Sequence, residues 1–399
     1  MIIRVNSFIV KFVYYYPLLS IALTSIDGKF SRLLAQFAIF VFIMAEFQIL
    51  KNRNRKKRDH LVFIGILLIF ILVFIARQGV WQLTNSDFYS FILILLSIDI
   101  FANSDYRQRL KNVMLNEKRF AFLIIGFYFF LAVSVLFSNG IVYGDTGIPE
   151  LHGPYEFAHA LAYLLLVIYS LSSLMKHYYN KKIYLYLMIA AGLFVAMTGV
   201  RTAFLAMVVI VLADYYSLKS FGKKSVVAIV SLTAFWVIYN FTDIISNSAI
   251  IEKTILAASK ATGITNGREL FNAYLFNHFF QFSFPDKMFG VGINNIKTLM
   301  SLRFGPIHAH NDVLNILLGY GIIGSIFFWT MFIRYIKNSK TWLPYLAMLT
   351  VLIWFNGLYM YHAFIPCMHL IAIFIDEIYE SKGRNNDRRK INYGNSSGL

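Results

Sequence analysis

Two arginines lie where chemistry on an anion is expected. Arg201 lies in the break between two apolar runs, within MTGVRT at 197–202, and Arg268 follows the breaker run GITNG at 263–267. A guanidinium offers a planar fork of N–H donors that matches the oxygens of a phosphate group. An arginine between two membrane spans can instead extend to the lipid headgroups, and Arg268 can pair with Glu269 at the surface. The two residues therefore predict an anion clamp, with ordinary surface arginines as the alternative.

A pair of histidines lies in IHAHNDVL at 307–314, directly before a long apolar run. The imidazole of His310 can accept a proton from a hydroxyl near pH 7, and Asn311 beside it can position the ring or the hydroxyl. His308 and His310 with Asp312 also suggest a metal site, but this spacing resembles no strong zinc signature. We expect a hydroxyl-binding imidazole here and no metal, with a structural histidine as the alternative.

Further polar residues are secondary candidates around such a site. Arg303 and Lys297 are candidates for contacts with a phosphate or a sugar. His159, with Glu150 and His152, can line the path of an acceptor.

Two glycine-rich segments need a separate interpretation. The segment GVGINN at 290–295 is flexible and polar, which makes it a further candidate for the site, with a simple turn as the alternative. The segment GYGIIG at 319–324 spells GxGxxG, but it lies inside an apolar run without a preceding soluble strand or a fitting acidic partner. Small residues at this spacing more often let membrane helices approach closely, so we expect packing and not dinucleotide binding.

The composition excludes an ordinary soluble protein. The 399 residues are 58% hydrophobic and 14% charged, and the mean hydropathy is +0.61, whereas soluble domains are about 45–50% apolar and about 25% charged. The single cysteine, Cys367, excludes an internal disulfide framework and a cysteine-based metal site. The net charge of +17 would suggest nucleic acid in a soluble chain. Here the basic residues cluster between apolar runs, so no nucleic-acid partner is expected.

Apolar runs of span length predict an all-α polytopic membrane protein with about 12 transmembrane helices and a single membrane domain, 1–399. The first run contains Lys11 and Pro17 and lacks a cleavage site, so we expect a retained helix. The predicted helices lie at 8–26, 30–50, 61–77, 88–102, 120–138, 156–175, 183–199, 202–216, 225–242, 312–333, 341–358 and 363–379.

The placement of basic residues predicts the orientation of the spans. Most of the 37 Lys and Arg residues fall in alternate connections and in the basic tail at 380–399. The positive-inside rule therefore predicts cytoplasmic termini and a large extracytoplasmic loop at 243–311, with helices at 249–262 and 268–283. Arg201, Arg268 and the start of the helix at 312 then lie at helix N-termini on the external face. Because these ends are positively polarised, we expect them to converge on one diphosphate-sized site.

Taken together, four motifs strongly resemble those of the O-antigen polymerase and ligase superfamily. They are TGVRT at 198–202, NGR at 266–268, FGVG at 289–292 and HNDVL at 310–314, followed by Gly321 and Gly324. Their order is similar to that of the family's C-terminal module, here at about 185–330. The resemblance implies a GT-C-like membrane glycosyltransferase, without metal or other cofactor. Such an enzyme takes a glycan from a polyprenyl diphosphate such as undecaprenyl diphosphate and passes it with inversion to a sugar hydroxyl.

The resemblance also implies roles for single residues. Arg201 and Arg268 resemble the diphosphate-binding arginines of the family, and His310 resembles the residue that contacts the acceptor hydroxyl. Family members often have Ser before the first arginine, where this chain has Val200, so a hydroxyl contact is lost there. The residue chemistry agrees, because fixed cations stabilise the charge that develops on a departing diphosphate. A pair of external carboxylates suited to hydrolysis is not evident, which favours transfer between sugars.

Three functions remain open from the sequence. The leading one is a polymerase that joins lipid-linked repeat units into O-antigen, lipopolysaccharide or exopolysaccharide chains at the bacterial cytoplasmic (inner) membrane, with a chain-length regulator and a flippase as candidate partners. The second is a ligase of the same superfamily, which transfers the finished glycan to an acceptor. The third is a polysaccharide flippase or proton-coupled transporter, for which the buried acids Glu46, Asp99 and Asp214 are the main argument. The external gathering of polar residues favours a transferase.

Overall fold

The computed structural model describes residues 2–23, 28–51, 57–79, 86–113, 117–137, 140–143, 149–155, 157–217, 268–304, 311–337 and 353. The predicted helices at 225–242, 341–358 and 363–379 lie outside these ranges, apart from residue 353, as does the predicted loop helix at 249–262. His308, His310 and the basic tail at 380–399 also lie outside the described residues.

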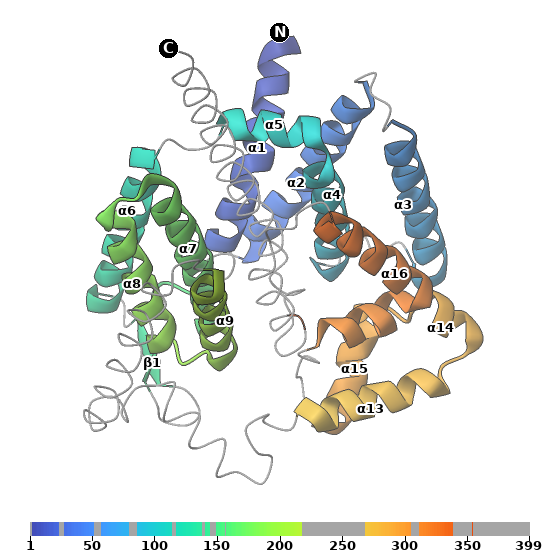
Figure 1. The fold of residues 1–399 in the computed structure, drawn as a ribbon. Helices are drawn as coiled ribbons and strands as arrows, with labels where there is room; N and C mark the ends of the chain where they lie inside the picture. The colour runs from blue at the N-terminus through green and yellow to red at the C-terminus, as the bar shows by residue number, and fades with distance from the viewer. Residues whose placement is uncertain are drawn as a thin grey trace, which may run out of the picture.

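Within these ranges the chain folds almost entirely into helices (Figure 1). Each apolar run that was predicted as a helix and falls on described residues corresponds to an observed helix, so these predictions are confirmed. A helix satisfies its backbone hydrogen bonds internally, as an apolar environment requires. The elements are α1 (Ile2–Leu23), α2 (Gly28–Lys51), α3 (Lys57–Gln78), α4 (Ser86–Ala102), α5 (Ser104–Val113), α6 (Glu117–Phe137), β1 (Ile141–Tyr143), β2 (Pro149–Leu151), α7 (Ala158–Tyr179), α8 (Lys182–Met197), α9 (Arg201–Ser217), α13 (Arg268–Gln281), α14 (Phe284–Phe289), α15 (Ile293–Phe304) and α16 (Asp312–Lys337).

Five stretches of the described helices are long and apolar enough to cross a membrane. They are Leu33–Lys51, His60–Gln78, Lys118–Phe137, Ala158–Lys176 and Asp312–Ile333. The bent pair formed by α4 and α5 is a sixth candidate, and α8 and the first part of α9 are shorter apolar helices. The described part is therefore a helical membrane-protein architecture, and the total of twelve spans stays a prediction.

The exposure of apolar side chains differs sharply between α6 and α7. Only 22% of the apolar stretch of α6 is buried, and Phe122, Phe129 and Leu136 are each more than two-thirds exposed. The corresponding stretch of α7 is 94% buried. A continuous exposed apolar surface of this kind is expected against lipid and not against water. We infer that α6 faces the bilayer and that α7 is the core of its helix group.

Helix α5 corrects one prediction, because the segment at 103–119 was expected to be a connection. The axes of α4 and α5 differ by 96°, and α5 lies across the end of the molecule that also holds the start of α1 (Figure 1). Tyr106 and Leu110, one turn apart, are buried, whereas Arg107 and Lys111 are partly exposed. This pattern is typical of an amphipathic helix that lies in the membrane interface.

The GVGINN segment, for which a simple turn was the alternative to a part in the site, has a packing role in the structure. Its start forms a tight backbone contact with α16, in which Val291 N–H donates to Leu318 C=O (2.8 Å) and Gly292 N–H donates to Gly319 C=O (3.0 Å). Helix α16 is broken there, because Gly321 has φ 71° and ψ −174°. Helix α15 then begins at Ile293. The glycines of GYGIIG therefore permit a close approach, as predicted. Gly321 lies against the backbone of Met288 and Gly290, and Gly324 lies against the ring of Phe70 on α3.

A charged contact ties this region to α3. Arg77, at the end of α3, donates to Asp286 Oδ1 (2.6 Å) and to the carbonyl of Pro285, and its guanidinium lies over the ring of Phe289. Gln78 donates to Gly290 C=O (3.0 Å). These contacts fix α14 beside the end of α3, and α14 packs on α16.

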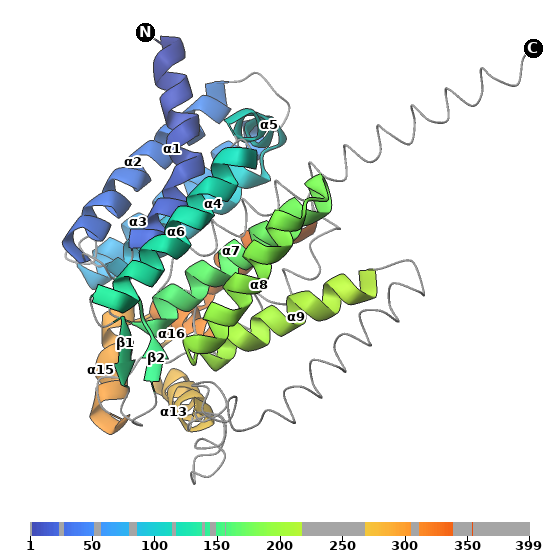
Figure 2. The same ribbon diagram turned by 90° about the vertical axis from the view of Figure 1, so that its left-hand side faces the viewer.

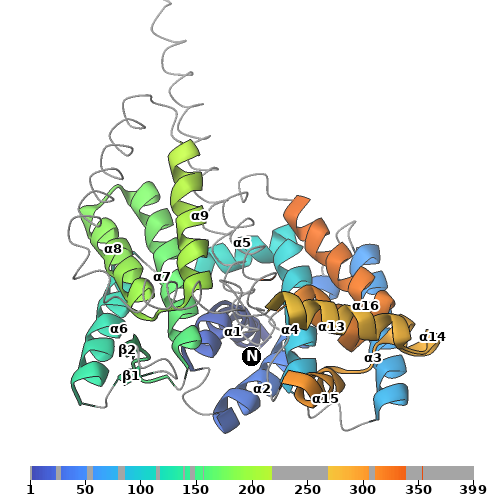
Figure 3. The same ribbon diagram turned by 90° about the horizontal axis from the view of Figure 1, so that it is seen from below.

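The helices form two groups with α1 and α2 between them (Figure 3). Helices α6–α9 make up one group, and α3, α4 and α13–α16 make up the other. The turn between α8 and α9, the β1–β2 hairpin and α13 lie at one end of the molecule, opposite α5 (Figures 1 and 2). The starts of α9 and α13 therefore lie at the same end of the molecule (Figure 1).

Candidate functional site

Arg201 is placed at the start of α9 by a tight turn. Thr198 is fully buried, and its hydroxyl donates to Val195 C=O (2.7 Å) and accepts from Val200 N–H (3.3 Å). Gly199 has φ 66°, in the left-handed region that glycine adopts without strain. The sequence Thr-Gly-Val thus sets the turn, and Arg201 follows it as the first, partly buried residue of α9.

Val200 fills a position in the hydrophobic core and is 3% exposed. A polar hydroxyl at this position would need a buried partner. In this chain, the hydroxyl that fastens the turn belongs to Thr198. Valine at this position therefore has a packing reason.

Arg268 is the first residue of α13, as the sequence predicted, and is partly buried. Burial lowers the pKa of its guanidinium, the charge of Arg201 lowers this pKa further, and Tyr163 raises it. Burial also lowers the pKa of the Arg201 guanidinium. Side-chain charges shift a neighbour's pKa appreciably only over short distances. The guanidinium of Arg201 and the hydroxyl of Tyr163 therefore both lie near Arg268.

The electrostatics of this arrangement favour an anion. Two positive charges that are close together and partly removed from water repel each other. A negative group bound between them is attracted by both charges and offsets this repulsion. Each arginine also begins a helix, where backbone N–H groups and the helix dipole favour negative charge. The arrangement can hold a group with two or more negative charges, such as a diphosphate.

Tyr163 was missed from the sequence, and it connects His159 to the arginines. Both residues lie on α7, four positions apart and therefore on the same helix face. The two rings are in edge-to-face contact with centroids 6.4 Å apart. Tyr163 is fully buried, whereas His159 is partly exposed. An aromatic residue in an apolar helix usually indicates packing, so the sequence carried no signal for Tyr163.

The start of α16 shows what Asn311 does. Its Oδ1 accepts from Val313 N–H (3.0 Å) and Leu314 N–H (3.2 Å), which is an N-cap, and its side chain is 2% exposed. Asp312 in the first turn is also buried. Asn311 therefore holds the helix start that follows His310.

We expect the Asn311→Ala protein to be less stable by about 0.5–2 kcal/mol, because two N–H groups of α16 lose their acceptor. The Asn311→Ser protein retains a hydroxyl acceptor and should lose less. Thermal unfolding of the two purified variants in detergent checks this ranking. Equal stability of the alanine variant and the unchanged protein would exclude the capping role.

Arg303 and Lys297, two of the secondary candidates, lie on α15. Arg303 is exposed and stacks on the rings of Tyr274 and Phe304, with its guanidinium carbon 5.3 and 5.5 Å from their centroids. It lines a pocket of about 400 Å³ between α13 and α15. Lys297 lies on α15 and is partly buried.

Glu150 and His152 pair with each other by the β1–β2 hairpin. Glu150 Oε2 lies 3.8 Å from His152 Nε2, and both side chains are largely buried. This pairing gives the two residues a structural contact of their own, and their predicted part in an acceptor path stays a prediction.

A second polar cluster lies at the opposite end and was only half predicted. Glu46 and Asp99 were noted as buried acids, but His60, which contacts both, was not. Asp214 has no described side chain. The ends of α2 and α4 and the start of α3 lie at the same membrane boundary. The alternation of spans could therefore have indicated that Glu46, His60 and Asp99 lie close together.

No protein-family model matches the chain, and no curated protein has a significantly similar sequence.

Proposed function

We propose that the protein is a membrane glycosyltransferase that polymerises oligosaccharide repeat units carried on a polyprenyl diphosphate. The observation that carries the proposal is the pairing of Arg201 and Arg268, each at the start of a helix, at one end of a helical membrane protein. The motif resemblance to the O-antigen polymerase and ligase superfamily adds to it.

The proposed step is a single displacement at the anomeric carbon of the donor glycan. The acceptor hydroxyl oxygen attacks this carbon, the bond to the diphosphate oxygen breaks, and its electron pair leaves with the diphosphate. The configuration therefore inverts. Arg201 and Arg268 stabilise the charge that grows on the leaving group, which requires no metal ion. His310 accepts the proton of the hydroxyl, and Asn311 holds the helix start beside it.

The proposal also states on which side of the membrane the reaction takes place. With twelve spans and the positive-inside rule, both termini lie in the cytoplasm and the arginine pair lies at the outer boundary of the bacterial inner membrane. The lipid carrier then presents its diphosphate at the headgroup level, where α9 and α13 begin. Helix α5, with its basic residues, lies at the inner boundary.

The experiment is a reconstituted reaction. Purified full-length protein is mixed with a lipid-linked oligosaccharide, without added metal, and the glycans are separated by gel. We expect a ladder of longer chains on the lipid. If only movement of the lipid-linked unit across vesicle membranes is found, the protein is a transporter and the proposal is wrong.

A gene deletion separates polymerase from ligase. Loss of a polymerase leaves single repeat units attached to the acceptor. Loss of a ligase removes all attached glycan and leaves polymer on the lipid. We expect the first result.

A further inference from the structure

Glu46, His60 and Asp99 form a compact buried cluster that the proposed transfer does not use. They come from α2, α3 and α4 and are 2%, 6% and 3% exposed. One ligand atom from each residue, an imidazole nitrogen or a carboxylate oxygen, lies within 4.8 Å of the other two. The end of α2, the start of α3 and the end of α4 lie at the α5 end of the molecule, away from α13 (Figure 1).

Hydrogen bonds settle the partners of His60 and Asp99. The Oδ1 of Asn103 accepts from Tyr106 N–H (2.9 Å) and caps α5, so its Nδ2 faces His60 Nε2 (3.0 Å). An amide nitrogen donates, so Nε2 accepts and the imidazole proton lies on Nδ1. This proton is donated to Asp99 Oδ2.

Glu46 is the member of the cluster whose carboxylate oxygens accept no hydrogen bond. Neither of its carboxylate oxygens has a hydrogen-bond donor, although Oε2 points to within 3.7 Å of His60 Nδ1. A buried polar group without a partner is costly, and a buried carboxylate more so. The two carboxylates face the same imidazole nitrogen, and its single proton is taken by Asp99.

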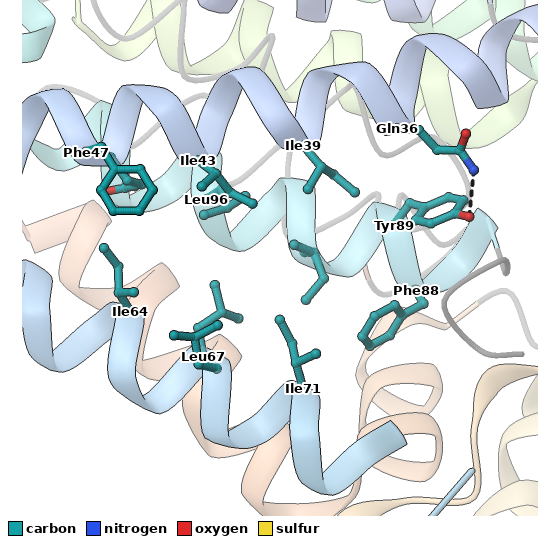
Figure 4. A pocket seen from close by; sticks show the side chains of 13 residues that line it. Gln36, Ile39, Ile43, Phe47, Ile64, Leu67, Ile71, Phe88, Tyr89 and Leu96 are labelled. Atoms are coloured by element: carbon teal, nitrogen blue, oxygen red, sulfur yellow. Dashed lines mark hydrogen bonds between the residues drawn. The ribbon is translucent and has the colours of Figure 1, made fainter. Parts of the chain in front are cut away.

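The surroundings of Glu46 are otherwise apolar. Glu46 also lines a pocket of about 460 Å³ between α2, α3 and α4. The walls are almost entirely apolar, with a hydrogen bond from Gln36 Nε2 to Tyr89 Oη (2.8 Å) at the far end (Figure 4). Water does not stabilise a charged carboxylate in such an apolar pocket, so a bound cation is the direct way to stabilise the Glu46 carboxylate.

We propose that Glu46, His60 and Asp99 bind one divalent transition-metal cation of the Mn²⁺, Fe²⁺ or Zn²⁺ class. One imidazole nitrogen and two carboxylates are the donors that these ions accept, whereas Mg²⁺ and Ca²⁺ prefer oxygen alone. At ligand distances of roughly 2.0–2.2 Å, two ligand atoms of one ion lie about 3.3–3.6 Å apart. Binding therefore requires Asp99 Oδ2 to move away from His60 Nδ1, whereas Glu46 Oε2, at 3.7 Å, is already close to this spacing.

The cation takes the place of the proton on Nδ1, and the imidazole proton moves to Nε2. Asn103 then turns its oxygen toward Nε2 and releases Tyr106 N–H, as expected for a residue that orients a metal-binding histidine. One capping hydrogen bond is exchanged for the neutralisation of two buried carboxylates. Binding therefore joins α2, α3 and α4 and changes the start of α5.

The test uses the full-length protein in detergent, freed of metal with a chelator and then transferred to chelator-free buffer. Mn²⁺, Fe²⁺ under anaerobic conditions, and Zn²⁺ are added separately. Bound metal is measured by mass spectrometry, and Tm by thermal unfolding. We expect one ion per chain and a rise in Tm of several degrees with at least one of the three ions.

Two substitutions sharpen this test. Glu46→Gln keeps the shape and removes the charge, so it should fold, lose the bound ion and lose the rise in Tm. Glu150→Gln alters another largely buried glutamate that faces a histidine, and it should keep both. Equal metal binding by the Glu46→Gln protein, or no binding of any of the ions by the unchanged protein, overturns the proposal. If Glu46→Gln raises Tm and metal has no effect on the unchanged protein, Glu46 is simply protonated, which also overturns it. None of these results depends on glycan transfer.

Discussion

Replacing Arg268 by alanine is expected to slow the growth of glycan chains by about 10²–10³-fold, the usual effect of removing one fixed donor to a developing negative charge. Arg268 is partly buried beside Arg201, so water does not readily replace its guanidinium. The departing diphosphate would then carry its charge with less compensation in the transition state. The initial rate of chain growth by equal amounts of folded protein measures the effect.

Two variants control for charge and for folding. Arg268→Lys keeps a cation but loses the planar fork, so we expect a rate between those of the alanine variant and the unchanged protein. Arg119 is exposed at the start of α6, away from α13, and Arg119→Ala should leave the rate unchanged. An Arg268→Ala protein that is folded and fully active would remove Arg268 from the site.

Replacing Gly290 by alanine is expected to destabilise the protein by about 3–5 kcal/mol. Gly290 has φ 81° and ψ 169°, a conformation that is essentially restricted to glycine. A Cβ there would overlap the backbone of Gly319 and Tyr320 at the contact between the GVGINN segment and α16. Because backbone surrounds it, no side-chain rotation relieves the overlap. Thermal unfolding in detergent, or the yield of monodisperse protein, measures the loss.

Gly65 provides the matched control. It lies in α3 and has nothing within 4 Å of the place where a Cβ would lie. Alanine there should be neutral or stabilising by up to about 1 kcal/mol, because alanine favours the helix. If Gly290→Ala and Gly65→Ala unfold at the same temperature, the contact between GVGINN and α16 is not as close as the structure shows.

The helices could be predicted from the sequence wherever apolar runs are long. Such a run has few alternatives to a helix, and breakers such as the glycine of MTGVRT mark its ends. The starts of α9 and α13 at Arg201 and Arg268 were predicted for this reason. Helix α5 was not, because seven of its ten residues are polar or charged and its apolar face is narrow. The break at Gly321 was also hidden, since it depends on the backbone of a segment about thirty residues earlier.

The candidate site could be predicted in part. Residue type and helix position pointed to the two arginines, and their proximity follows from their helices starting at the same end. Tyr163 could not be found, because its importance comes from Arg268 on another helix. His60 was missed, although the alternation of spans places it at the same membrane boundary as Glu46 and Asp99. Asn311 was expected beside a substrate hydroxyl, and the structure shows its oxygen occupied by two backbone N–H groups.

A double-mutant cycle tests the central claim most directly, since the claim is that Arg201 and Arg268 hold one leaving group. The rates of chain growth are compared for Arg201→Ala, Arg268→Ala and the double variant. Residues that act on the same group are not additive, so the double variant should be slowed much less than the product of the two single effects. A loss equal to that product would show that the two arginines act independently, and the account of a shared diphosphate would be wrong.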